Sequence, residues 1–470
     1  MTRVDSYRNI GSILLACLIL MLPSLFNGFP LVYSDTGMYL KSGFEWFVPV
    51  DRPIVYGLLI RMSSFLGLWG IVIIQNLLLS FLLFFCGKEL LSSRTEYYKW
   101  HVIICALLAS FSSVGWYSGQ VMPDIFVSFI PLSLFLIIGK NPNMLIRIVA
   151  GIICFLALLV HYSHIILGIL IVLVLIAIAI SKKRDSLSLK NLLAPIALII
   201  VAGISLALIN LRLDDHFGWS KGSSVFVIGK LLDSGNLQNI LSEECDSGQA
   251  SDLQWCTYVD QLPSDSRALL WSPESPIAKL GGWENSTEAN NEIFKIIVSH
   301  PGYWPRIAAD AGRSTLSQLT ENSLGSGLVT DWYSKESSPP YQFVKKYFPN
   351  QMNSYLLSRQ NGNLWEQGLS FNFLNNLNYV LIILSILLIF CSYMKRVSVK
   401  LNSELKLIRN LSLASIVLNA LITGSLANVY DRLQSRISWI FILLALWILL
   451  ILFQNLNKVW LRMKSSESST

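Results

Sequence analysis

Long apolar runs separated by short polar segments recur along most of the chain. A run of about 18 or more apolar residues is the pattern of a helix that crosses a membrane. The pattern predicts an all-α polytopic membrane protein. The expected spans number about ten and lie at approximately 10–28, 69–88, 100–118, 124–139, 145–161, 164–181, 189–209, 377–394, 408–429 and 437–455. The first run is too long for the core of a signal peptide and no small-residue cleavage site follows it, so we expect it to be retained.

Basic residues between the runs predict the orientation, because Lys and Arg accumulate in cytoplasmic loops. Placing the N-terminus in the cytoplasm puts more than half of the Lys and Arg, and few acids, on the cytoplasmic side. The basic groups at 182–184 and 395–396, and Lys458, all fall there. We therefore expect both termini in the cytoplasm.

The predicted spans divide the chain into a first membrane bundle (1–209), a segment outside the cytoplasm (210–376) and a second membrane bundle (377–470). The middle segment carries more acids than bases, and its apolar residues recur three and four apart without strand-like alternation. We expect a mainly helical soluble insert. Segment 53–68 is apolar, holds Arg61 and is too short to span, so it predicts an amphipathic helix at the outer interface.

Cysteine placement agrees with these sides. Cys245 and Cys256 are the two cysteines of the segment outside the cytoplasm, and the others lie in apolar runs. Two cysteines in an exported segment predict a disulfide. Charged residues make up 14% of the chain, against about 25% in soluble domains. The net charge of +7 follows from the basic cytoplasmic loops, so it gives no reason to expect a nucleic-acid partner.

Polar and ionisable side chains gather at the outer ends of the predicted spans. Such groups are costly at membrane depth, so they tend to face cavities and serve a function. The candidates are Asp35, Tyr39, Asp51 and Arg52 in the first outer segment, Gln120 and Asp124 in the second, His161 and His164 in the third, and Arg432 and Arg436 in the last.

These residue types fit one kind of chemistry. A partly buried carboxylate acts as a general base that takes a proton from an attacking hydroxyl. Arginines present fixed donor forks to phosphate oxygens. A base and a phosphate clamp facing a membrane cavity suit group transfer from a lipid-linked phosphate donor to an acceptor outside the cytoplasm.

Four short motifs carry a family resemblance: SDTGMYL after the first span, DRPIVYGLL before the second, VMPDIF at the fourth and NVYDRLQSRISW before the last. Together they resemble the GT-C glycosyltransferase superfamily, which includes protein O-mannosyltransferases and lipid A aminoarabinose transferase. Those enzymes place an acid in the first outer loop and an HPPL-like motif before an interface helix. Here Asp51, Arg52 and Pro53 stand in place of His-Pro-Pro.

The resemblance implies a GT-C-like fold and an inverting transferase that uses a polyprenyl-phosphate-linked sugar donor. The acceptor would be a glycan, a lipid or a protein, and the location the bacterial cytoplasmic (inner) membrane, surrounded by membrane lipids. Asp35 would be the base, and Arg432 or Arg436 would contact the lipid phosphate. Asp124 would orient the acceptor or help to hold a divalent ion; no cofactor is otherwise expected.

We take Asp35 and Asp51 as catalytic candidates and the remaining eight as substrate-binding candidates; the metal ligands stay unknown, since the HxxH spacing alone is weak. Each candidate also has a plainer interpretation. These are Asp35 and Asp124 as helix caps, Asp51 as an ion-pair partner of Arg52, His161 and His164 as interfacial residues, and Arg432 and Arg436 as side chains that reach lipid headgroups.

Three other functions stay open. A polysaccharide polymerase or O-antigen ligase would use outer arginines on a diphosphate-linked donor. A transporter or flippase for a lipid-linked substrate would carry charges near the bilayer midplane and internal repeats, and the sequence shows few of the former and none of the latter. A non-catalytic assembly factor would use the insert as a binding module.

Overall fold

The computed structural model describes residues 3–91, 96–140, 142–181, 189–246, 253–361 and 368–467. Within these ranges the chain forms helices α1 to α24, joined by loops and 3-10 turns. The described residues form no strand, and their single isolated bridge joins Leu31 to Gln120. The all-α fold class is thereby confirmed. The basic group at 182–184 lies outside the described residues.

Six helices are long and apolar enough to cross a membrane. They are α5 (Trp69–Leu90), α10 (Tyr162–Ser181), α11 (Leu189–Asp214), α21 (Asn372–Cys391), α23 (Ser403–Leu426) and α24 (Asp431–Glu467). Four apolar helices are shorter: α4 (Val55–Ser63), α6 (Tyr97–Phe111), α8 (Phe126–Ile138) and α9 (Met144–Leu159). The chain has the composition of a multi-pass membrane protein, and the figure of about ten spans stays a prediction.

Local chemistry explains why some apolar runs become short helices. The run at 100–118 is interrupted at Ser112, whose backbone is extended and whose hydroxyl donates to the carbonyl of Leu108 at 2.7 Å. The chain continues as α7 (Val114–Ser118). The first run likewise forms two helices, α1 (Arg3–Leu20) and α2 (Leu22–Asn27), with a proline in the first turn of α2.

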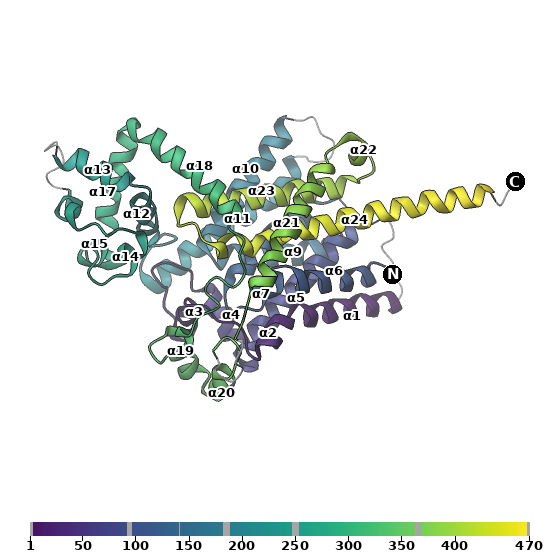
Figure 1. Ribbon diagram of the computed structural model, residues 1–470, viewed down its shortest axis with the longest axis horizontal. Coiled ribbons are helices and arrows are strands. Elements are labelled where there is room, and N and C mark those ends of the chain that lie inside the picture. The colour runs from purple at the N-terminus through teal and green to yellow at the C-terminus, as the bar shows by residue number, and fades with distance from the viewer. Residues whose placement is uncertain are drawn as a thin grey trace.

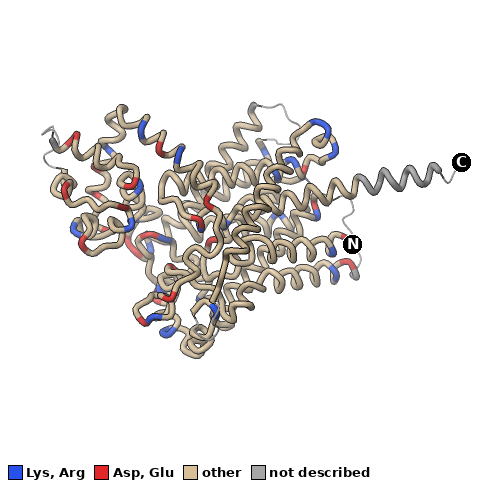
Figure 2. Tube along the Cα trace, viewed as in Figure 1, with Lys and Arg blue, Asp and Glu red and all other residues tan. Residues whose placement is uncertain are grey.

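Helices α1, α5, α6 and α24 have roughly parallel axes, and both termini lie at the same end of the bundle (Figure 1). Every residue of α8 is buried, so this helix forms the centre of the bundle. Charged residues gather at the two ends, and the helical stretches between them carry almost none (Figure 2). That distribution is expected of helices whose middle sections face hydrocarbon.

Helix α4 has one buried and one exposed apolar face. Tyr56 and Ile60 are fully buried, whereas Met62 and, just beyond the helix, Phe65 are 74% and 81% exposed. Arg61 folds back to donate to the carbonyl of Phe44 at 3.0 Å. Both faces are apolar, and an amphipathic helix at a membrane interface stays a prediction for 53–68.

The segment at 210–376 divides into two parts. Its first part has a core of its own, which includes the fully buried Trp255. It contains α12 (Ser223–Asp233), α13 (Asn236–Asp246), α14 (Ser266–Trp271), α15 (Pro276–Lys279), α16 (Gly282–Asn285) and α17 (Thr287–Ser299). A disulfide between Cys245 and Cys256, with Cα atoms 5.7 Å apart, joins α13 to the following 3-10 turn.

The second part of the segment packs on the membrane bundle. Helix α18 (Trp304–Thr320) lies along α23 so closely that a Cβ atom at Gly424 would meet the Ser314 carbonyl at 2.7 Å. Helix α19 (Pro339–Tyr347) packs on α3 (Thr36–Glu45), and α20 (Met352–Leu356) follows. Tyr333 and Tyr355 belong to the main core of the bundle. The insert is therefore only partly a separate unit.

Candidate functional site

The loop before α3 and the loop between α7 and α8 are held side by side by backbone hydrogen bonds. The amide of Leu31 donates to the carbonyl of Gly119 at 3.0 Å, and the amide of Val121 donates to the carbonyl of Leu31 at 2.8 Å. The hydroxyl of Thr36 adds a bond of 3.1 Å to the Val121 carbonyl. These bonds bring Asp35, at the start of α3, close to Asp124, in the 3-10 turn before α8.

Asp35 lies between two arginines that come from distant parts of the chain. Nη2 of Arg52, in the loop before α4, is 3.4 Å from Oδ1 of Asp35. Nη1 of Arg432, in the first turn of α24, donates to Oδ2 of Asp35 at 3.2 Å. Arg52 also pairs with Asp51, with Nη2 2.5 Å from Oδ2. The pairing expected of Asp51 and Arg52 is present, and it extends to Asp35.

The network continues inward from Arg432. Nη1 of Arg432 is 3.9 Å from Oδ2 of Asp124, and Nη1 of Arg436 donates to Oδ1 of Asp124 at 3.0 Å. Nη2 of Arg436 also donates to the side-chain oxygen of Asn419 on α23 at 3.2 Å. Acids and arginines alternate from Asp51 to Arg436, so the charges compensate one another, as buried charges require.

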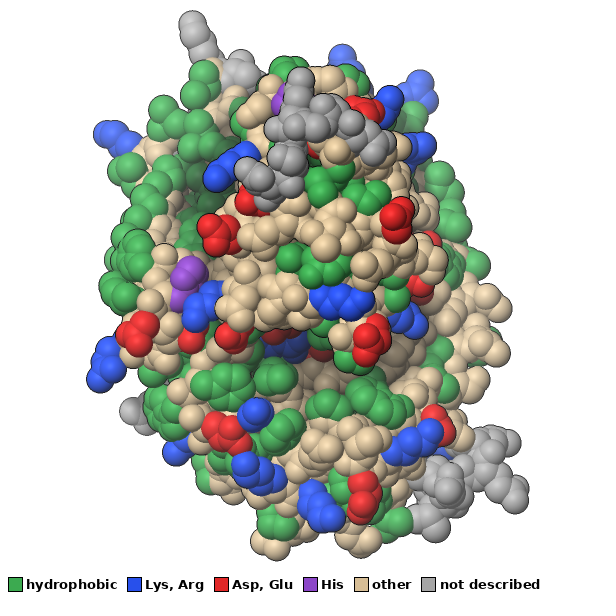
Figure 3. Space-filling view, turned by 90° about the vertical axis from the view of Figure 1, so that its left-hand side faces the viewer, with side chains coloured by type: hydrophobic (Ala, Val, Ile, Leu, Met, Phe, Trp, Pro, Cys, Tyr) green, Lys and Arg blue, Asp and Glu red, His purple; other side chains and the backbone are tan. Residues whose placement is uncertain are grey.

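One end of this network is more open than the other. The side chains of Asp35 and Arg432 are 26% and 19% exposed, whereas those of Asp124 and Arg436 are 3% and 1% exposed. Figure 3 views the molecule from the left-hand side of Figure 1 and shows a hollow between an upper and a lower part, with basic and acidic side chains along it. Asp35 is therefore the carboxylate that a molecule from outside would meet most readily.

Aromatic faces orient the two arginines that hold Asp35. The guanidinium of Arg52 lies over the ring of Tyr39 at 5.1 Å, and that of Arg432 lies over the ring of Tyr33 at 4.1 Å. Such contacts suit a planar, delocalised cation. Gly327, at φ +74°, lies against the Tyr33 ring, so the insert helps to hold this ring in place.

The insert also holds the start of α24. Gln318 of α18 donates to the carbonyl of Tyr430 at 2.8 Å and accepts from its amide at 3.1 Å. The amide of Ser323 donates to Oδ1 of Asp431 at 2.8 Å. These bonds fix the residues immediately before Arg432.

Asp35 occupies the N-cap position of α3, but its side chain makes no capping hydrogen bond there. Burial alone would raise the pKa of Asp35, but the charges and hydrogen bonds of Arg52 and Arg432 outweigh that effect and hold the pKa at about 2. The carboxylate is therefore ionised at neutral pH. The interpretation of Asp35 as a helix cap therefore agrees with its position before α3 but does not explain its contacts with Arg52 and Arg432.

Several buried polar atoms at the site make no hydrogen bond to any described residue. They include Nη1 of Arg52, Nε of Arg436, Oδ2 of Asp124 and the side-chain oxygen of Gln120. Buried polar atoms normally find partners. The two arginine atoms are donors, and an added acceptor near them would complete their hydrogen bonding.

The two histidines lie together, with stacked rings whose centroids are 5.1 Å apart. His164 bonds the carbonyl of Ala157 through Nδ1 at 2.7 Å, and His161 contacts the hydroxyl of Ser163 at 2.9 Å. Burial, followed by the positive charges of the site arginines, lowers the pKa of His161 to about 3, so this ring is neutral. The described residues contain no group of three or more His, Cys, Asp or Glu that could hold a metal ion.

Gln120 takes part in a chain of hydrogen bonds that links the loop before α8 to α5. Its backbone carbonyl accepts from the side chain of Gln75 on α5 at 2.9 Å, and Gln75 accepts in turn from Tyr56 at 2.7 Å. Asp124 lies against two arginines, a setting that suits ion pairing better than cation binding. All four outer segments predicted from the sequence thus contribute to one region of the molecule.

Sequence analysis missed three residues that shape this region: Tyr33, Gln75 and Asn419. Tyr33 stands two residues before Asp35 and directly precedes the SDTGMYL motif, so its position was a usable signal. Gln75 and Asn419 are polar residues within apolar runs, which is a signal for a buried role, but a sequence does not show what such a residue contacts. Comparison with known proteins finds no protein-family model, no curated protein and no solved structure that matches the chain.

Proposed function

We propose that the protein is an integral membrane glycosyltransferase that moves a sugar from a polyprenyl-phosphate donor to an acceptor at the face where Asp35 lies. The observation that carries the proposal is the placement of the Asp35 carboxylate between Arg52 and Arg432, at 3.4 Å and 3.2 Å, at the open end of a buried network. The proposed base and the two arginines that would bind phosphate thus lie close enough together to contact a single bound sugar phosphate.

The proposed reaction is a single displacement. An acceptor hydroxyl attacks the anomeric carbon, its proton passes to Asp35, and the bond from carbon to the phosphate oxygen breaks. The electron pair of that bond leaves with the polyprenyl phosphate, whose added charge Arg432 and Arg52 stabilise. Fixed cations aimed at a developing charge in a water-poor site lower a barrier by several kcal/mol.

The pairing of Asp35 with the arginines has a consequence for its strength as a base. With a pKa of about 2 the carboxylate is ionised but weakly basic. A donor phosphate that binds Arg432 competes with Asp35 for the same donors. Losing these contacts raises the pKa of Asp35, since the arginines are what depress it. Donor binding would therefore prepare the base.

Orientation and location belong to the same proposal. We place both termini in the cytoplasm of a bacterium, about ten spans in its inner membrane and the site at the outer surface. The lipid chain of the donor would lie among the helices, and a glycan, lipid or protein acceptor would approach from outside. The proposal requires no metal, and a divalent ion as an additional component stays open.

The experiment uses the full chain in vesicles with polyprenyl-phosphate sugars of several kinds and measures the release of free polyprenyl phosphate. We expect release from at least one donor. Arg432→Ala and Arg52→Ala should raise the donor concentration needed for half-maximal release by roughly tenfold or more. The control is Arg306→Ala, an exposed arginine of α18 outside the site, which should change nothing. Absence of release from every donor, or an equal effect of Arg306→Ala, contradicts the proposal.

A further inference from the structure

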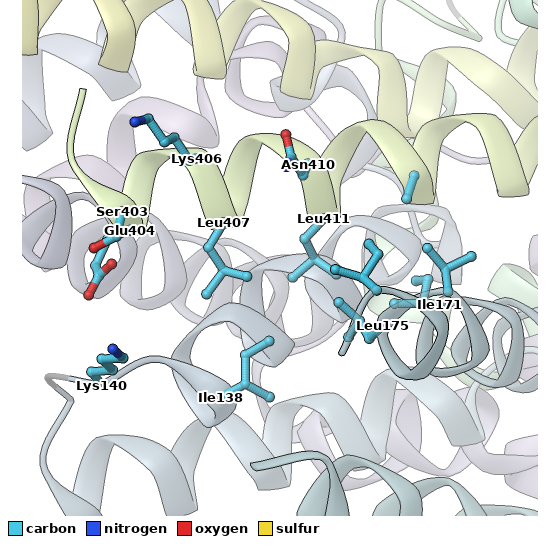
Figure 4. Close-up of a pocket in the computed structure, with 13 residues that line it drawn as sticks. Ile138, Lys140, Ile171, Leu175, Ser403, Glu404, Lys406, Leu407, Asn410 and Leu411 are labelled. Carbon is cyan, nitrogen blue, oxygen red and sulfur yellow. The ribbon is translucent and has the colours of Figure 1, made fainter. Parts of the chain in front are cut away.

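A second site lies at the opposite end of the bundle from Asp35. It is a cavity of about 280 Å³ between α8, α10 and α23. Its walls are mostly apolar and include Ile138, Ile171, Leu175, Leu407 and Leu411. Figure 4 shows Lys140, Ser403 and Glu404 gathered at one end of it, and Ile171 and Leu175 at the other.

The three helices that line the cavity also place it far from the outer site. Asp124 directly precedes α8, and the cavity reaches Ile138 at the other end of that helix. At about 1.5 Å per residue, these positions are roughly 20 Å apart. Similarly, His164 begins α10 while the cavity is lined by the later part of that helix, and Asn419 lies beyond the part of α23 that lines it.

The cavity adjoins the apolar surface of the bundle. On α10, Leu173 and Ile180 are 54% and 71% exposed, and the half-buried Val174 and Ile178 of the same stretch line the cavity. An apolar chain lying against the exposed side chains can continue into the cavity without crossing a polar barrier. This continuity identifies the surrounding lipid as the source of the occupant.

Charge at the polar end selects the kind of lipid. Lys140 and Lys406 line the cavity together with one acid, Glu404. The short helix α22 (Lys395–Ser398), which precedes α23, carries two further basic residues that do not line the cavity, and Figure 2 shows basic residues gathered at this turn. Basic pockets between membrane helices on the cytoplasmic side bind anionic headgroups. The excess of positive charge favours a phosphate group here.

We propose that this cavity binds one anionic phospholipid, with an acyl chain between α10 and α23 and its phosphate at the polar end, beside Lys140. The occupant is distinct from the donor of the proposed reaction, because a phosphate at that end lies roughly 20 Å from Arg432 along the helices. The site does not depend on the proposed enzymatic function. It would link α8, α10 and α23, the same helices whose outer ends frame the Asp35 network.

The test measures bound lipid by native mass spectrometry of the full chain, taken from nanodiscs that contain phosphatidylglycerol and phosphatidylcholine. We expect one phosphatidylglycerol to be retained in preference to phosphatidylcholine. The double variant Lys140→Ala/Lys406→Ala should lower its occupancy roughly tenfold. Ala414→Phe, which fills the apolar part of the cavity and leaves both lysines, should lower it as well.

A matched control removes two charges from the same end of the molecule outside the cavity. Lys395→Ala/Arg396→Ala alters exposed residues of α22, and the retained phosphatidylglycerol should stay within twofold of the wild-type level. An equal loss in this control would mean general surface attraction and would overturn the proposal, as would equal retention of the two lipids. A photoactivatable phosphatidylglycerol bound to the wild-type chain provides a test without mutations. Cross-links should fall on α10 and α23, and cross-links confined to other helices would contradict the site.

Discussion

Asp35 and Arg432 lie 397 positions apart in the chain, and the guanidinium of Arg432 donates a hydrogen bond of 3.2 Å to the Asp35 carboxylate. The contact joins the first outer loop to the last helix of the bundle. Arg52 reaches the same carboxylate from the loop before α4. The site therefore assembles only when the first and last membrane regions pack together, and the α18 contacts with Tyr430 help to hold that arrangement.

The buried pair of Asp124 and Arg436 should dominate the stability of this region. Asp124→Asn or Arg436→Ala leaves a buried charge without its partner and should destabilise the fold by about 3–5 kcal/mol. The double variant Asp124→Leu/Arg436→Met removes both charges and should be less destabilised than either single variant. Unfolding of the purified protein in detergent measures the difference.

The control for that series is the exposed pair of Asp331 and Lys335, 2.9 Å apart. Exposed pairs contribute at most about 1 kcal/mol, so Asp331→Asn should have little effect. A double variant less stable than both single variants would show that the Asp124 and Arg436 charges are not compensating each other.

Gly327 should be necessary for the position of Tyr33. A Cβ atom there would lie 2.1 Å from Cε2 of the Tyr33 ring, and the backbone angle of φ +74° is itself unfavourable for other residues. Gly327→Ala should therefore displace Tyr33 from Arg432 and destabilise the fold by about 1–3 kcal/mol. Gly302→Ala is the control, because no atom lies within 4 Å of its added Cβ. Equal stability of the two variants would contradict the proposed contact.

The stability of the protein should depend on the ionisation of Asp35 in acid. Its pKa is about 2 in the fold, against about 3.9 in an unfolded chain. Because the folded pKa is the lower one, the stabilisation is fully present above about pH 4 and is lost as the pH falls through about 2. Between pH 5 and pH 3 the wild type should lose about 1 kcal/mol more than Asp35→Asn does. Unfolding curves at the two pH values measure this, and identical losses would show that Asp35 does not titrate as described.

Orientation can be tested by cysteine labelling of intact cells with a reagent that does not cross membranes. Ser337 is exposed just before α19, and Lys400 is exposed just before α23. We expect labelling at Ser337→Cys and none at Lys400→Cys, in a background where the exposed Cys391 is replaced by serine. Labelling at Lys400→Cys alone would reverse the proposed sides.

The sequence predicted the all-α fold class, and it identified as candidates the charged residues that lie together in the structure. Both inferences rest on strong signals, namely long apolar runs and ionisable groups at their ends. Helix lengths were harder to predict. At the end of α6, the hydroxyl of Ser112 donates a hydrogen bond to the carbonyl of Leu108. A serine within an apolar run is not enough to predict such a break in the helix. Helix α6 is consequently shorter than a full span.

Long-range contacts account for the rest. The insert was expected to be one soluble unit because its composition differs from that of the runs around it. Composition does not show that α18 lies along α23 or that Tyr355 enters the main core. In the same way, Asp35 and Asp51 were identified as neighbours in sequence, while the contact of Asn419 with Arg436 depends on packing between helices.

The central claim is that Asp35 accepts the proton of the attacking hydroxyl, and the rate of sugar transfer by Asp35→Asn tests it most directly. The substitution keeps the shape of the side chain and removes the base. Measured in the same vesicles as the wild type and Asp331→Asn, transfer by Asp35→Asn should fall by roughly 100-fold or more, with donor binding retained. A rate for Asp35→Asn within about threefold of the wild type, at equal amounts of folded protein, would contradict the claim.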